Sequence, residues 1–184
     1  MTADWSPLWL GLRVALMVSA LALVVAAWPA WRLARRNWPV VTLIARFLSI
    51  VPAVIVASLA APAFPWPVAV AAGLVRGISY TLVACRTAFQ SVNPGYVKAA
   101  RMTGASGWRI FWALALPLGG SAAMAAAAEV FSETMLEVAV ALWIVGRLSA
   151  PPGGAILLTA LAGSALALWL RRDAGAIPER QAAR

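Results

Sequence analysis

The sequence has no histidine, a single cysteine and few acidic residues. Without histidine, the chain lacks the side chain that most often serves as general acid, general base or metal ligand near neutral pH. The one cysteine, Cys85, excludes an internal disulfide and any metal site built from several cysteines. We therefore expect neither a metal nor another cofactor.

Motifs for nucleotide hydrolysis and nucleophilic catalysis are also missing. The chain contains no Gly-x-x-x-x-Gly-Lys-Ser/Thr phosphate loop, so ATP hydrolysis would have to come from a partner protein. The usual catalytic triads are excluded because they need histidine. An enzyme acting within the membrane would depend on three glutamates near residue 133, with no nucleophile beside them. We expect that the protein is not an enzyme.

Apolar sequence, in contrast, is abundant. Of the 184 residues, 63% are hydrophobic and only 11% are charged, whereas roughly a quarter of the residues of a soluble domain are charged. A membrane-spanning helix takes about 20 apolar residues, which sets a ceiling of about five or six spans for this length. The composition predicts an all-α polytopic membrane protein.

Apolar runs place about five transmembrane helices along the chain. The first three predicted spans are 8–31, 40–61 and 68–85, with a Pro-rich and aromatic turn at 62–67. The next apolar run, 111–145, would be about 52 Å long as one helix, which exceeds an ordinary span.

We therefore divide this long run near Phe131 into a fourth span and a shorter helix at the membrane surface. Small residues at 119–128 predict close helix packing. A break is predicted at 151–154, and residues 155–170 form the fifth span. We expect one transmembrane domain over 1–172, followed by a disordered cytoplasmic tail at 173–184.

Basic residues indicate the orientation of these spans. Arg147 alone lies on the side opposite the loop that follows the first span, and three arginines, Arg13, Arg46 and Arg76, lie inside spans. All other Lys and Arg residues fall on one side, which predicts an external N-terminus and a cytoplasmic C-terminus. This distribution accounts for the net charge of +9 without a nucleic-acid partner.

The cytoplasmic segment at about 87–110 contains two predicted short helices. Asn93 can cap a first helix that begins at Pro94 and ends near Met102. Gly104 can adopt the left-handed conformation that ends this helix, and Ser106 can cap a second one. By itself this pattern is also typical of an ordinary solvated basic loop.

The residues that follow carry a resemblance to a known family. Ala99, Ala100, Gly104, Leu116 and Pro117 match in register the EAA signature of the inner-membrane permease subunits of ABC importers. That signature reads Glu-Ala-Ala, three residues, Gly, nine residues, Ile, one residue, Leu-Pro. The resemblance extends over about 8–146 and implies the core of a type I importer permease in a bacterial inner membrane.

This resemblance implies a set of partners. In the family, the EAA segment forms a coupling helix that docks on a cytoplasmic ATPase, and two permease subunits, identical or different, form the substrate path. An extracytoplasmic binding protein delivers the substrate. Residues 131–142 are similar to permeases for molybdate, sulfate, ferric iron and thiamine, and residues 8–16 are similar to the start of molybdate-type permeases.

Two positions of the signature differ from the family. Leu114 occupies the Ile position, and Lys98 stands where the family has Glu, which reverses the charge at the ATPase contact. Either the ATPase is adapted to Lys98, or this subunit is the weaker half of a heterodimeric pair. The alternative from another class is a non-transporting membrane scaffold or assembly subunit with a degenerate coupling motif.

Three carboxylates lie in the apolar sequence that follows. Glu129, Glu133 and Glu137 recur every four residues and therefore share one face of a helix. An ionised residue at membrane depth costs roughly 2.5 kcal/mol or more, so it faces the bundle interior or a water-filled path. Two compatible interpretations stay open: ion pairs with the three arginines inside spans, or a lining for the substrate path or gate. Unpaired carboxylates would repel an anionic substrate.

Overall fold

The computed structural model describes residues 5–36, 38–50, 66–144 and 150–182. These residues form helices and contain no strand. The long helices are α1 (Ser6–Ala34), α2 (Pro39–Ile50), α4 (Trp66–Gln90), α7 (Leu116–Ile144) and α8 (Ala150–Ala182). Between α4 and α7 lie α5 (Pro94–Met102), α6 (Gly107–Ile110) and the π-helix η1 (Phe111–Ala115).

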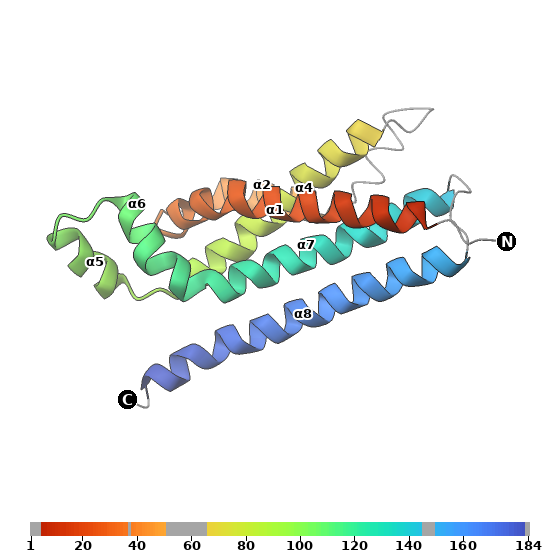
Figure 1. The fold of residues 1–184 in the computed structure, drawn as a ribbon. Coiled ribbons are helices and arrows are strands. Elements are labelled where there is room, and N and C mark those ends of the chain that lie inside the picture. Colours follow the sequence, from red (N-terminus) through yellow and green to blue (C-terminus); the bar gives the residue numbers. More distant parts are fainter. Residues whose placement is uncertain (1–4, 37, 51–65, 145–149, 183–184) are drawn as a thin grey trace.

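The long helices form an elongated bundle, with α5 and α6 at one end (Figure 1). Helix α1 begins at the opposite end, whereas α8 ends at the same end as α5 and α6 (Figure 1). Three segments of the described chain are long and apolar enough to cross a membrane: Leu8–Ala34, Gly107–Val140 and Gly154–Arg172. The all-α membrane fold predicted from composition is confirmed.

The second and third predicted spans correspond to α2 and α4. Helix α2 is apolar but short, and the remainder of the predicted second span, 51–61, lies outside the described residues, as does most of the predicted turn at 62–67. Helix α4 has 25 residues, a length of about 37 Å that suffices for a span. It carries two basic residues, Arg76 and Arg86.

Helices α1, α4 and α7 meet in a tightly packed core. Val18 and Ala22 of α1 form a buried cluster with Val130 of α7. Gly77 of α4 lies against all three, because a Cβ at this position would be 3.0 Å from Val130 Cγ1 and 3.4 Å from Ala22 Cβ. Absence of a side chain at Gly77 therefore brings the three helices into direct contact.

Helices α7 and α8 are joined by polar contacts as well as by close packing. The Ser132 hydroxyl donates to the Ala160 carbonyl at 2.6 Å and shares a hydrogen bond with the Ser164 hydroxyl at 2.6 Å. Gly163 packs beside Phe131, whose ring would be 3.2 Å from a Cβ at that glycine. Hydrogen bonds from serine hydroxyls are a usual polar contact between the helices of a membrane protein.

The predicted division near Phe131 is wrong, because α7 continues without a break to Ile144. Residues 121–144 contain neither glycine nor proline, and their alanine-rich sequence favours a continuous helix. A helix longer than the membrane is thick can tilt or extend beyond it. Length alone was therefore not a reason to divide the run.

The predictions for the last helix also need correction. Helix α8 begins at Ala150, so the prolines of the predicted break, Pro151 and Pro152, lie in its first turn. Proline is tolerated there because the first amide groups of a helix have no partner within it. The helix runs to Ala182, beyond the predicted end of the fifth span at residue 170.

Gly119 of α7 gives a direct test of this packing, because it lies on the buried ring of Phe89 in α4. A Cβ at Gly119 would be 2.7 Å from Phe89 Cδ1 and Cε1, whereas a Cβ at Gly120 would meet nothing within 4 Å. We predict that Gly119→Leu lowers the free energy of unfolding by about 1–3 kcal/mol, because the ring must move. Thermal unfolding in one detergent, with Gly120→Leu as the matched control, measures this. Equal stability of the two variants would contradict the prediction.

Candidate functional site

The segment from 93 to 110, hereafter the α5–α6 hairpin, forms one end of the molecule. The Asn93 side chain accepts a hydrogen bond from the Gly95 amide at 2.8 Å, and the Ser106 hydroxyl accepts one from the Arg109 amide at 3.3 Å. Gly104 has a φ of +80°, so it takes the left-handed conformation between the two helices. Both caps and the glycine turn are confirmed as predicted.

One face of α5 holds the hairpin on the bundle. Val97 is buried in the cluster formed by the ends of α1, α4 and α7, and Ala100 packs against the same cluster. Arg35 donates to the Val92 carbonyl at 3.2 Å and stacks over the Trp31 ring at 4.3 Å. Burial, and then the nearby Arg101 charge, lower the pKa of Arg35.

Aromatic rings tie the hairpin to α1 and α4. Trp108 of α6 meets Trp28 of α1 edge to face, with centroids 4.8 Å apart. Phe111 of η1 contacts Trp28 at 5.3 Å and Phe89 of α4 at 5.9 Å, in similar geometry. Such pairs contribute about 0.5–1.5 kcal/mol each beyond the burial of their area. The hairpin is therefore a packed extension of the bundle.

The outer face of α5 is open. Met102 is 80% exposed and Tyr96 is 55% exposed, so this face presents apolar side chains outward. Lys98 and Ala99 are exposed on the same helix, as is Gly104 just beyond it. The EAA residues thus divide into an inner anchor and an outer surface.

The end of the EAA signature lies in the approach to α7. Leu114 and Leu116 pack against the same buried cluster as the hairpin, whereas Pro117 is exposed. Pro117 lacks the amide hydrogen that a helix would direct to the Ala113 carbonyl. The wider π-turn of η1, which includes Ala113, ends directly before this site.

The acidic row on α7 is paired with two arginines. Arg76 of α4 forms an ion pair with Glu133 and a second one with Glu137, the latter at 2.9 Å between Nη1 and Oε1. Their side chains are mostly buried, with Arg76 13% and Glu137 16% exposed. One arginine thus bridges two successive turns of α7.

Glu129 has a different partner, Arg171 of α8. The Arg171 guanidinium forms an ion pair with Glu129 and donates to the Tyr80 hydroxyl of α4 at 2.7 Å. The sequence placed Arg171 on the cytoplasmic side, directly after the fifth predicted span, and did not predict it as a partner of the glutamates. The only available signal was its position directly after an apolar run, which a snorkelling arginine also occupies.

The other two candidate partners lie elsewhere. Arg13 of α1 and Arg46 of α2 are both exposed, and the described part of the chain records no ion pair for either. The structure therefore brings together Arg76 with two of the three glutamates, and Arg171 takes the third. Among the described residues, no group of three His, Cys, Asp or Glu side chains could hold a metal ion.

The sequence is similar to one family of membrane proteins over most of its length. The sequence profile of the family described as binding-protein-dependent transport system inner membrane component matches residues 8–177. The chain belongs to this family. It is an ABC transport permease, and its family is a non-enzymatic membrane component of transport systems. No curated protein sequence matches the permease at a significant level.

Arg76 allows the importance of the acidic row to be measured. We predict that Arg76→Gln lowers the free energy of unfolding by up to about 3 kcal/mol, because two partly buried carboxylates lose their shared counter-ion. The matched control is Arg13→Gln, which removes an exposed arginine from another long helix. Thermal unfolding of both purified permeases gives the difference. If the two variants melt together, the Arg76 bridge does not stabilise the bundle.

Proposed function

We propose that this permease is a subunit of an ABC importer in a bacterial inner membrane, crossing it about five times. Its N-terminus is outside the cell and its C-terminus is in the cytoplasm. A cytoplasmic ATPase docks on the α5–α6 hairpin and drives alternating access. An extracytoplasmic binding protein delivers the substrate.

The two-sided construction of α5 carries this proposal. Its inner residues, Val97 and Ala100, contact the bundle. Ala99 and Met102 lie on the other side of the helix and are exposed. The small side chain of Ala99 favours close approach of a partner surface. The matching EAA register, in a chain of this family, supports an ATPase as that partner.

A second permease subunit, identical or paralogous, completes the substrate path. One subunit of about five spans is too small to enclose a path by itself. The acidic row on α7 lines this path or its gate, and its arginine partners neutralise part of its charge. Resemblance at residues 131–142 favours a small ion or solute of the molybdate or sulfate, ferric iron, or thiamine class.

Lys98 favours an ATPase adapted to a positive charge. No Asp or Glu occurs between residues 5 and 128, so every charged residue of the hairpin and of the adjoining helix ends is basic. An acidic docking groove on the ATPase would complement this surface. If this chain is instead the weaker half of a heterodimer, the docking groove of the ATPase suits the family's Glu at this position and not Lys98.

Substitution at Ala99 tests ATPase coupling. We predict that Ala99→Asp abolishes uptake and co-purification of the ATPase, because it places a charge on the outer face of α5 without disturbing the anchored face. The matched control is Gln90→Asp, an exposed position at the end of α4. Both variants are purified in gentle detergent, and bound ATPase is quantified. A non-transporting scaffold would instead tolerate Ala99→Asp in every assay.

Charge reversal at Lys98 separates the two alternatives for the ATPase. If the docking groove is acidic, Lys98→Glu weakens ATPase binding about tenfold or more, and Lys98→Gln weakens it less. Binding of the wild-type permease then decreases as salt increases. Tighter binding by Lys98→Glu would mean that the groove suits Glu, which identifies this chain as the weaker half of a pair.

A further inference from the structure

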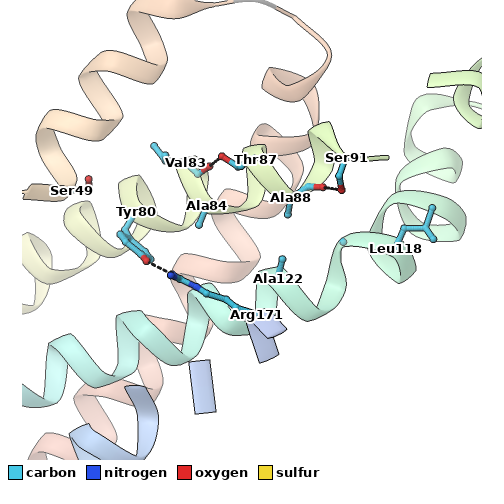
Figure 2. A pocket seen from close by; sticks show the side chains of 11 residues that line it. Ser49, Tyr80, Val83, Ala84, Thr87, Ala88, Ser91, Leu118, Ala122 and Arg171 are labelled. Carbon is cyan, nitrogen blue, oxygen red and sulfur yellow. Dashed lines mark hydrogen bonds between the residues drawn. The ribbon is translucent and has the colours of Figure 1, made fainter. Parts of the chain in front are cut away.

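A cavity of about 520 Å³ lies in the half of the bundle nearest the α5–α6 hairpin. Its walls come from four helices, α2, α4, α7 and α8, and Figure 2 shows Arg171 and Tyr80 joined by a hydrogen bond across it. The volume is within the range of small-ligand sites. Nothing in the EAA signature or the acidic row predicts this cavity.

One charged side chain lines the cavity among the residues that the structure describes. It is Arg171, and the ion pair with Glu129, which is not part of the lining, balances its charge. Both recorded bonds of the guanidinium use Nη2, which leaves the protons on Nε and Nη1 for a ligand. A ligand in the cavity would therefore meet N–H donors of the guanidinium.

The remaining polar groups of the lining are hydroxyls. They are the side chains of Ser49, Tyr80, Thr87 and Ser91. Three of them donate to carbonyls of their own helices, Ser49 to Arg46, Thr87 to Val83 and Ser91 to Ala88. A serine or threonine hydroxyl can rotate to donate to a ligand instead. The described lining therefore offers hydroxyl and guanidinium donors and contains no carboxylate.

Pairing of the acidic row removes the main objection to an anionic substrate. Bare carboxylates would repel an anion, but Glu133 and Glu137 are held by Arg76, and Glu129 is held by Arg171. Arg76 neutralises only one of its two carboxylates, so one negative charge remains on Glu133 and Glu137. None of these three residues lines the cavity. An anion in the cavity thus contacts the guanidinium, while the three glutamates lie outside the lining and are paired.

We propose that this cavity binds a small oxyanion, with Arg171 as its charged ligand and the hydroxyls of α2 and α4 as additional donors. This inference rests on the proposed import function and selects the oxyanion class among its substrates. Ferric iron and thiamine, which are cations, would find no carboxylate among the described residues of the lining. Glu129 and Tyr80 act as positioning residues because they hold the guanidinium at the cavity wall.

A cysteine placed in the cavity tests this proposal. Cys85 is fully buried and is first replaced by alanine to remove background labelling. Ala84→Cys then provides a reactive group on the lining, beside the α4 hydroxyls (Figure 2). The full permease, purified with the subunits that accompany it, is labelled with a maleimide in the presence of sulfate, molybdate, chloride or thiamine at equal ionic strength.

We expect sulfate or molybdate to slow labelling several-fold relative to chloride, and thiamine to leave the rate unchanged. Arg171→Gln should abolish this protection, whereas Arg171→Lys keeps the charge and retains part of it. The matched control, Arg172→Gln, removes the adjacent exposed arginine, which does not line the cavity, and should retain full protection. Unchanged labelling without added anion shows that the cavity persists in each variant.

Several outcomes would overturn the proposal. These are protection by thiamine, absence of protection by both oxyanions, or equal protection in Arg171→Gln and the parent. Ala99→Asp should keep the protection, because the cavity does not include the outer face of α5. Loss of ATPase binding with intact protection, or the reverse, therefore separates the coupling proposal from the oxyanion proposal.

Discussion

Charged side chains within an apolar bundle need partners, and two arginine–glutamate groups fix how the helices of this permease lie against one another. Arg76 joins α4 to two turns of α7, and Arg171 joins α8 to α7 through Glu129 and to α4 through Tyr80. An unpaired charge at this depth costs several kcal/mol. Sliding any of these helices by one turn would break a pair, so the ion pairs define the register of α4, α7 and α8.

The hairpin at the end of the bundle depends on the same packed helices. Trp108 and Phe111 lie against Trp28 of α1, and Phe111 also meets Phe89 of α4. Phe89 in turn lies against Gly119, at the start of α7. The rings of α6 and η1 therefore contact α1 and α4 directly, and Phe89 extends this packing to α7.

Local features of the fold were predictable because they depend on neighbouring residues. The caps at Asn93 and Ser106 and the left-handed Gly104 follow from side-chain chemistry and backbone sterics within a few positions. Predictions based on span length were less successful. The division near Phe131 assumed that a helix ends where the membrane does, and α7 continues to Ile144.

The sequence by itself determined the class of fold, the hairpin and the presence of an acidic row in an apolar helix. Which arginine meets which glutamate was decided only by the tertiary structure, since Arg76 and Glu133 are 57 residues apart and Arg171 and Glu129 are 42 residues apart. Composition and periodicity describe one helix at a time. The ion pairs and the cavity beside Arg171 arise where several helices converge, and this convergence depends on packing between segments distant in the chain.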